Sequence, residues 1–226
     1  MLYIVSTPIG NLKDITLRAI ETLKSVDFIA CEDTRKTLIL LNHYQIKKPL
    51  ISYYSYNQIR RGEEILKLLT QGKSVALVSD SGTPGISDPG AQLIRRAIEN
   101  NIPLTHIPGP TALIAALSLS GLPTHKFAFE GFLPKKKGPR KKRLILLSKD
   151  DRTIILYESP YRIKVLLSEI LEIMGDRDIA VARELTKKFE EIRRGRVSEL
   201  IKYFEKTRPR GEFIVVVSGS AISVLS

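Results

Sequence analysis

Short apolar runs alternate with helical patterns along the chain, and this alternation is the feature that most restricts its fold. In the first half, stretches with helical spacing separate the apolar runs at 2–6, 27–31, 49–54, 74–79 and 104–107. Continuous apolar strands joined by helices are typical of a parallel sheet covered on both faces. The first half is therefore predicted to form an open, mostly parallel sheet.

The regular alternation of apolar strands and helices ends after "PGP" at 108–110. Further strands are expected at 126–132, 153–159, 178–184, 190–197 and 212–219, with helices at about 160–174 and 198–206. We predict an α/β protein of two α/β domains, residues 1–112 and 113–226. The sheet is expected to be mostly parallel in the N-terminal domain and mixed in the C-terminal domain.

Composition narrows the kind of partner and the compartment. The net charge of +12 favours an anionic partner such as nucleic acid, although a charged surface suited to high temperature is an alternative. A single cysteine excludes an intrachain disulfide and suits a reducing compartment. With no signal-peptide pattern and no apolar run near the ~18 residues of a membrane span, we expect a cytoplasmic protein without membrane contact.

Loops rich in Gly, Pro, Ser and acidic residues follow four of the first five predicted strands. The carboxyl ends of parallel strands share one edge, where ligands bind in open sheets. The longest loop, "SDSGTPGISDPG" at 79–90, contains no Lys or Arg and matches neither phosphate-binding nor dinucleotide-binding glycine patterns. Asp88 and Pro89 are expected to cap and start the next helix, while Gly82 and Gly85 allow close approach of a ligand to the backbone.

Two charged motifs also follow strands. "CEDTRKT" contains Glu32 and Arg35, and "ARELTKKFEE" contains Glu184 and Lys187. Opposite charges at a ligand-binding edge can orient a hydroxyl and shift a pKa. A solvated ion-pair cluster is an equally good interpretation. The three histidines and the cysteine lack metal-ligand spacing, so no metal is predicted.

A dense run of cations, "PKKKGPRKKR", occupies residues 134–143. Its Gly and Pro residues argue against a helix, so a flexible basic loop that contacts an RNA or DNA backbone is expected. Arginines at 193, 194, 196, 208 and 210 are candidates to extend this patch. The residues predicted to bind RNA are Lys135, Lys136, Lys137, Arg140, Lys141, Lys142 and Arg143.

Eight motifs in order resemble one known family: "STPIGNLKDIT", "CEDTRKT", "SDSGTPGISDPG", "PGPTALIAALSLSGL", "FEGFLPKK", "YESPYR", "RELTKKFEE" and "RGEFIVVVSG". The chain resembles the small-subunit ribosomal RNA methyltransferases I over residues 1–219. That family belongs to the tetrapyrrole (corrin/porphyrin) methylase superfamily. The resemblance implies a homodimer with S-adenosylmethionine in a cleft between two α/β domains. It also implies methylation of a cytidine 2′-hydroxyl in 16S rRNA of the small ribosomal subunit.

The resemblance also implies which positions contact the cofactor. These are Pro8, Ser81, Gly82, Thr83, Ile86, Thr111, Ala112, Glu158, Leu185 and Gly211. Relatives commonly carry Ala at position 81 and His at position 161, where this chain has Ser81 and Tyr161. Tyr161 is therefore not assigned as an essential base. Many relatives have a further C-terminal segment, and any RNA contact that it makes is expected to be missing here.

Transfer of a methyl group to a ribose hydroxyl needs alignment and a proton acceptor. We hypothesise that Glu184 or Glu32 accepts the proton, and that Lys187 and Arg35 stabilise charge or hold phosphate. Two other functions stay open at this point. A small-molecule tetrapyrrole methylase would have no need of the basic run, and a non-catalytic RNA-binding protein would not bind the cofactor.

Overall fold

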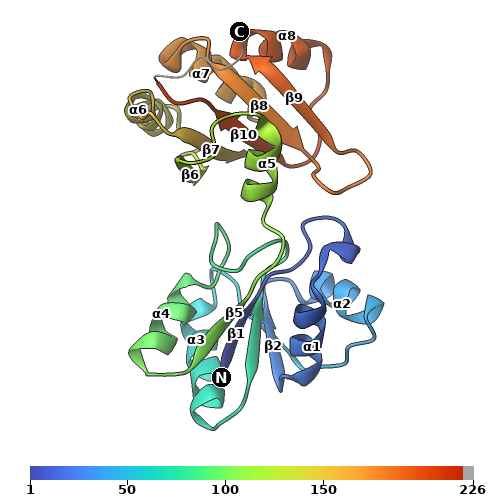
Figure 1. Ribbon diagram of the computed structural model, residues 1–226. Coiled ribbons are helices and arrows are strands. Elements are labelled where there is room, and N and C mark those ends of the chain that lie inside the picture. The colour runs from blue at the N-terminus through green and yellow to red at the C-terminus, as the bar shows by residue number, and fades with distance from the viewer. Residues whose placement is uncertain (221–226) are drawn as a thin grey trace. The chain divides into compact units, whose positions relative to one another are not determined.

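The computed structural model describes residues 1–220, and the chain folds into two compact units, Met1–Thr111 and Ala112–Ser226. This boundary is one residue before the one expected from the sequence. Each unit is built around its own five-stranded sheet (Figure 1). The predicted α/β class, with a parallel first sheet and a mixed second sheet, is confirmed.

The first unit is an open parallel sheet with strand order β3-β2-β4-β1-β5. Because every strand runs in the same direction, all five carboxyl ends lie at one edge. Its elements are β1 (Leu2–Val5), the 3-10 helix η1 (Leu12–Asp14), α1 (Leu17–Ser25), β2 (Phe28–Cys31), α2 (Thr34–His43), β3 (Leu50–Ser52), α3 (Gln58–Thr70), β4 (Val75–Val78), α4 (Ala91–Glu99) and β5 (Leu104–Ile107).

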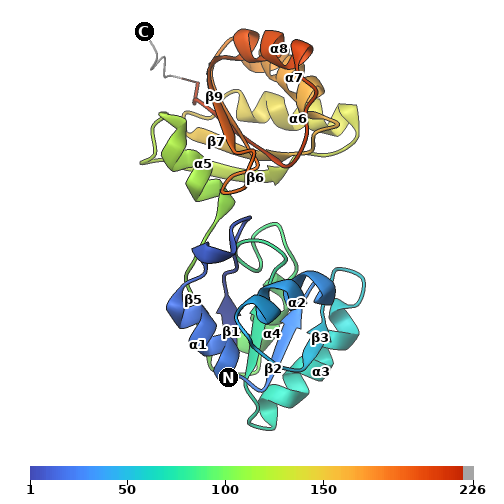
Figure 2. The same ribbon diagram turned by 90° about the vertical axis from the view of Figure 1, so that its right-hand side faces the viewer.

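Helices cover both faces of this sheet, as Figures 1 and 2 show. Alternate residues of the strands therefore enter two separate cores. Leu77 packs with residues of α3 and α4, whereas Ala76 and Val78 pack with residues of α1 and α2. Thr16 starts α1 by accepting a hydrogen bond from Ala19 N at 3.1 Å, which satisfies a free N–H of the first turn.

The second unit is a mixed sheet with strand order β6-β7-β10-β8-β9. Only β6 and β7 pair in parallel, and the other neighbours are antiparallel. Helices α6, α7 and α8 pack against one face, while α5 packs against β8, β9 and β10 on the other (Figures 1 and 2). The elements are α5 (Ala112–Ser120), β6 (Phe127–Phe132), α6 (Lys137–Leu147), β7 (Thr153–Glu158), α7 (Ile163–Met174), β8 (Asp178–Arg183), β9 (Glu191–Arg196), α8 (Val197–Lys206) and β10 (Phe213–Val217).

The prediction of a flexible loop at 134–143 is wrong, because α6 begins at Lys137. Pro139 falls in the first turn, where a backbone N–H has no partner within the helix, so proline costs no hydrogen bond there. The first helical bond runs from Arg140 N to the Lys136 carbonyl at 3.1 Å. Leu144 and Leu147 follow Arg140 on one face and are buried in the core, which stabilises the helix by tertiary packing.

The predicted start of α4 is also wrong. The helix begins at Ala91 with Gly90 as its N-cap and no capping side chain, rather than at Asp88 and Pro89. Gly90 adopts a φ of 145°, a conformation that side chains disfavour. A Cβ at this position would lie 3.1 Å from both Gly85 N and a methyl group of Leu77. Close packing of the loop against β4 therefore requires glycine and fixes the helix start.

No helix within residues 1–220 is long and apolar enough to span a lipid bilayer.

Candidate functional site

The loops after β1 and β4 are bonded to each other at the carboxyl edge of the first sheet. Thr7 N donates to the Gly82 carbonyl at 2.8 Å, and Gly82 N donates to the Thr7 carbonyl at 3.1 Å. The Ser79 hydroxyl also donates to the Gly82 carbonyl, at 3.0 Å. The first part of the long 79–90 loop is thus fixed in place, although residues 79 and 82 are far from residue 7 in the sequence.

A row of hydroxyl groups extends this connection to the loop after β5. The Ser6 hydroxyl lies 2.9 Å from that of Thr83, which lies 2.9 Å from that of Thr111. His106 Nε2 lies 3.4 Å from the Ser6 hydroxyl. We call Ser6, Thr83 and Thr111 the hydroxyl row. It joins the loops after three parallel strands into one surface of neutral polar groups, suited to a ligand with hydroxyl and amino groups.

Glycine allows the backbones of these loops to approach. Gly82 has a φ of 84°, in the left-handed region that favours glycine. A Cβ on Gly109 would lie 2.9 Å from Ser6 Cβ, closer than real side chains pack. Pro8, also predicted to contact the cofactor, is buried beside these loops and lines a pocket of about 110 Å3 with Lys36 and Asp80.

The structure thus brings several of the predicted cofactor residues of the first unit together, but not all of them. Gly82, Thr83 and Thr111 belong to the bonded loops, and Ser81 lies between their anchored residues. Ile86 instead lines an apolar groove of about 550 Å3 along α4. Ala112 is the first residue of α5 in the second unit. The predicted contacts with the cofactor stay predictions.

Glu32 lies in the loop after β2 and lines a polar groove of about 420 Å3. The other lining residues come from the segments after β3 and β4, and they include Ser55, Gln58 and Asp88. The Glu32 carboxylate forms no hydrogen bond or ion pair with the described residues 1–220. Burial, with a smaller contribution from the negative charge of Asp80, raises the pKa of Glu32 above its ordinary value of 4.5.

Asp80 is a member of this edge that the sequence analysis missed. One of its carboxylate oxygens accepts from Asp33 N at 3.0 Å, and the other accepts from Lys36 Nζ at 2.8 Å. It links the loops after β2 and β4, which are neighbours in the sheet. Only the order of the strands in the sheet could have indicated the contact between Lys36 and Asp80, because 44 residues separate them in the sequence.

Arg35 is not brought to Glu32. Its guanidinium makes a two-pronged contact with Asp33, at 3.0 and 2.7 Å, and its side chain is 88% exposed. Asp33 also caps α2 by accepting from Arg35 N, and these bonds lower the pKa of Asp33 to about 2. Arg35 and Asp33 of "CEDTRKT" therefore form a solvated ion pair, which was the alternative interpretation of this motif.

In the second unit, Glu184 and Lys187 do meet. Lys187 Nζ lies 3.0 Å from Glu184 Oε1, and Glu212 N donates to the same oxygen at 3.1 Å. Burial alone would raise the pKa of Glu184, but the contacts from Glu212 N and Lys187 outweigh it and lower the pKa below 4.5. Glu184 is consequently a poorer proton acceptor than Glu32 at neutral pH.

Gly211 packs directly against this carboxylate. It has a φ of 84°, and a Cβ built there would collide with Glu184 Oε1. We expect Gly211→Ala to lose about 1–2 kcal/mol from the left-handed backbone and to displace Glu184 from Lys187 in addition. Gly72→Ala, just after the end of α3, is the matched control, because its φ is 83° and nothing lies within 4 Å of the added methyl. Thermal unfolding checks the difference, and equal losses in the two variants would contradict it.

Glu158 and Leu185 are both buried. The Glu158 side chain is 1% exposed, and its Oε1 lies 2.7 Å from Arg162 Nη2 and accepts from Ser159 N at 2.7 Å. Leu185 lies between Glu184 and Thr186, which both have positive φ. Any contact of Glu158 or Leu185 with a ligand is therefore expected through the main chain.

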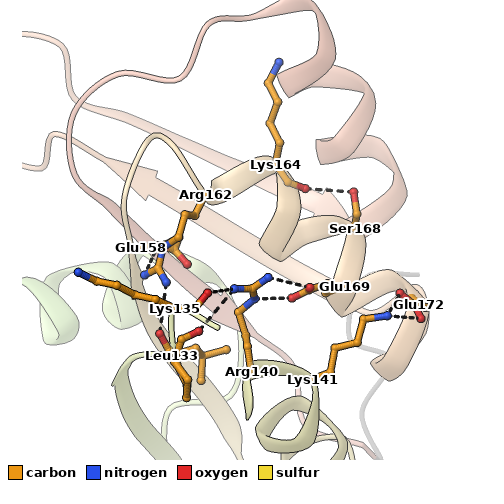
Figure 3. A network of polar contacts seen from close by, with 11 residues as sticks. Leu133, Lys135, Arg140, Lys141, Glu158, Arg162, Lys164, Ser168, Glu169 and Glu172 are labelled. Carbon is orange, nitrogen blue, oxygen red and sulfur yellow. Dashed lines mark hydrogen bonds and ion pairs between the residues drawn. The ribbon is translucent and has the colours of Figure 1, made fainter. Parts of the chain in front are cut away.

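The basic run divides into buried and exposed cations. Figure 3 shows Lys135, Arg140 and Lys141 of this run with their contacts. The prediction that Arg140 contacts RNA is wrong for this structure, because its side chain is only 8% exposed and is paired with Glu169. Lys141 pairs with Glu172 at 2.6 Å and Arg143 with Glu130 at 2.7 Å. The exposed cations that form no ion pair with residues 1–220 are Lys135, Lys136, Lys137 and Lys142.

Three of the arginines considered as an extension of this patch already have partners. Arg193 pairs with Glu191 at 2.7 Å, and Arg196 pairs with Asp178 at 3.3 Å. Arg194 donates to the Leu119 carbonyl at 2.8 Å. Among the described residues, no three His, Cys, Asp or Glu side chains are grouped so that they could hold a metal ion.

Comparison with known proteins identifies the family. Residues 1–201 match the tetrapyrrole (corrin/porphyrin) methylases. The chain is 53% identical to a ribosomal RNA small subunit methyltransferase I of Thermotoga maritima, covering 96% of this chain and 98% of the relative. It is 50% identical to the protein of the same name from Bacillus subtilis, covering 97% and 75%.

Solved structures show the same fold at low identity. A cobalt precorrin-4 methyltransferase of cobalamin biosynthesis superimposes with a TM-score of 0.70 at 19% identity, covering 96% of this chain and 94% of that chain. A uroporphyrin-III C-methyltransferase from Thermus thermophilus, complexed with S-adenosylhomocysteine, gives 0.67 at 20% identity, covering 96% of both chains. With the sequence matches, these results confirm the resemblance: the chain belongs to the tetrapyrrole (corrin/porphyrin) methylase family and, within it, to the ribosomal RNA small subunit methyltransferases I.

Proposed function

We propose that this chain is an S-adenosylmethionine-dependent methyltransferase that modifies a cytidine 2′-hydroxyl in 16S rRNA of the small ribosomal subunit. The observation that carries the proposal is the 53% identity to a ribosomal RNA small subunit methyltransferase I over 96% of the chain. The similar tetrapyrrole methyltransferases of known structure are only about 20% identical. This difference favours the RNA substrate over a tetrapyrrole. The proposed enzyme acts in the cytoplasm as a homodimer.

The bonded loops of the first unit support a cofactor site. The hydroxyl row and the main-chain groups near Gly82 offer neutral donors and acceptors, and no Lys or Arg lies within 79–90. Such a surface fits the ribose hydroxyls and amino groups of S-adenosylmethionine better than it fits a triphosphate. When bound, S-adenosylmethionine supplies the methyl group.

Glu32 is the proton acceptor that the geometry supports best. In this role the Glu32 carboxylate would accept the proton of the ribose 2′-hydroxyl, whose oxygen would receive the methyl group that S-adenosylmethionine supplies. An acceptor with a raised pKa holds this proton more readily than an ordinary carboxylate. Lys187 is held by Glu184 and Glu212, so we assign it to charge balance rather than to proton transfer.

The central test is methyl transfer itself. Small subunits from a strain that lacks the modification are incubated with labelled S-adenosylmethionine, and nuclease digestion with mass spectrometry then locates the methyl group. We expect label on a cytidine ribose of 16S rRNA. A parallel reaction offers a tetrapyrrole in place of the small subunits. Label on the tetrapyrrole but not on RNA would support the small-molecule alternative. RNA binding without cofactor binding would support a non-catalytic role.

Thr83→Val tests the hydroxyl row. The substitution removes the hydroxyl that lies within 2.9 Å of both Ser6 and Thr111 and preserves the volume of the side chain. We expect about 2–12-fold weaker S-adenosylmethionine binding by calorimetry, equivalent to a net loss of about 0.5–1.5 kcal/mol. Thr70→Val, which removes an exposed hydroxyl bonded to Lys67 O at the end of α3, is the control and should leave the affinity unchanged. Unchanged affinity in Thr83→Val would separate the row from the cofactor.

A further inference from the structure

Two arginines hold the short backbone segment 133–136 that connects β6 to α6, here called the β6–α6 segment (Figure 3). Arg140 makes two parallel contacts with Glu169, at 2.6 and 2.8 Å. Its remaining terminal nitrogen, Nη1, donates to the Lys135 carbonyl at 2.7 Å and to the Pro134 carbonyl at 3.5 Å. The Arg140 and Glu169 side chains are 8% and 6% exposed, so this arrangement is shielded from water.

Arg162 holds the other end of the same segment. Its Nη2 lies 2.7 Å from Glu158 Oε1, and its Nη1 donates to the Leu133 carbonyl at 3.4 Å. Three consecutive carbonyls, from residues 133 to 135, therefore accept hydrogen bonds from two guanidinium groups. Each guanidinium is in turn fixed by a buried carboxylate from β7 or α7.

Stability alone does not account for this arrangement. A buried ion pair contributes little net stability, and well-packed apolar side chains often replace it without loss. Arginine has a feature that apolar residues and lysine lack, because its planar fork can bind a carboxylate and a backbone carbonyl at once. Here the two guanidinium groups fix the backbone that leads into Lys135, Lys136 and Lys137, whose side chains are exposed.

We propose that Arg140 and Arg162 are positioning residues that hold the β6–α6 segment in the conformation in which Lys135, Lys136 and Lys137 contact an RNA phosphate backbone. This inference rests on the proposed function. A segment that is ordered before binding loses less conformational entropy when RNA binds. Neither arginine touches phosphate, and their contribution to affinity comes entirely through the lysines.

The double variant Arg140→Met/Glu169→Leu tests the proposal, because it removes both charges and leaves no buried charge unpaired. We expect near-wild-type thermal unfolding and NMR order parameters of the backbone N–H groups of residues 135–138 that fall from about 0.85 towards 0.6. Affinity for small-subunit RNA should fall about 5–10-fold, while the slope of log K against log salt stays unchanged. Binding of S-adenosylmethionine should stay unchanged as well.

The matched control is Arg95→Met/Glu99→Leu, which removes an exposed arginine–glutamate pair of α4 with no bond to a carbonyl. It should leave the order parameters of residues 135–138 and the RNA affinity at wild-type values. Arg140→Lys provides a second variant if the double variant fails to fold, since it retains the charge but loses the fork. It should reproduce the lower order parameters and the weaker RNA binding.

The outcomes separate this inference from the proposed function. Unchanged order parameters in residues 135–138 in both Arg140 variants would overturn the positioning role, whether or not the protein methylates RNA. A salt slope smaller by about 0.7–0.9 would show that Arg140 itself neutralises a phosphate, which also overturns it. If the wild-type protein bound no small-subunit RNA, the proposed function and the RNA role of the segment would both fall, while the order parameters would still report on the backbone.

Discussion

Glu32→Gln is expected to lower methyl transfer about 10²–10⁴-fold, the usual contribution of a positioned general base. Glutamine preserves the shape of the side chain but cannot accept the ribose proton. Glu32 forms no ion pair or hydrogen bond with residues 1–220, so the substitution breaks no contact there. The affinity for S-adenosylmethionine should stay unchanged. Single-turnover rates with saturating cofactor and small subunits measure the effect on the chemical step.

The pH dependence provides an independent readout. The ionised carboxylate is the active form, so the rate should rise with pH through a pKa above 4.5, the direction in which burial and Asp80 shift it. Glu32→Gln should abolish this rise. A raised carboxylate pKa in the folded state also means that ionisation opposes folding as pH increases above the unfolded pKa. The variant should therefore be no less stable than the wild type at pH 7.

Glu184→Gln is the informative comparison. Because the pKa of Glu184 is lowered in the folded protein, its ionisation stabilises the fold above its unfolded pKa, and this stability is lost as pH falls through the folded pKa. The substitution should reduce stability at neutral pH while keeping the pH-dependent rise in rate. A large loss of rate in Glu184→Gln, together with normal turnover in Glu32→Gln, would reverse the assignment.

The sequence predicted the strands and the polar loops at the carboxyl edge of the first sheet because both depend on local patterns. The buried run of β4 and the turn residues that follow it are adjacent in the chain. Asp80 was missed because its partners Asp33 and Lys36 come from the loop after β2 and from α2, and their proximity depends on the order of strands in the sheet. Local patterns indicate which residues follow strands, whereas topology decides which of these residues meet.

For the basic run at 134–143, composition alone predicted the wrong secondary structure. Gly138 and Pro139 argue locally against a helix, but the packing of Leu144 and Leu147 outweighs that preference. Arg140 cannot be distinguished by type from its cationic neighbours, because its partner Glu169 is 29 residues away. Tertiary pairing therefore separates the cations that build the second unit from those that are available to a ligand.

Replacing Lys135, Lys136 and Lys137 together with alanine should weaken binding to small-subunit RNA by the order of 10²-fold at about 0.1 M salt. Each phosphate contact contributes about 0.7–0.9 to the slope of log K against log salt, and this contribution vanishes near 1 M. Three lost contacts therefore lower the slope by about 2–3, and the wild-type and variant affinities should converge at high salt. The variant should keep its fold, because all three side chains are exposed.

The matched control replaces Lys24, Lys47 and Lys67, which are also exposed and carry the same total charge. Lys24 and Lys67 lie in the last turns of α1 and α3, and Lys47 lies shortly before β3. All three therefore lie at the amino edge of the first sheet, opposite the loops proposed to bind the cofactor. If binding depended only on the net charge of +12, both triple variants would lose the same affinity. A loss confined to the variant of residues 135–137 would instead locate the RNA contact on the β6–α6 segment and the first turn of α6.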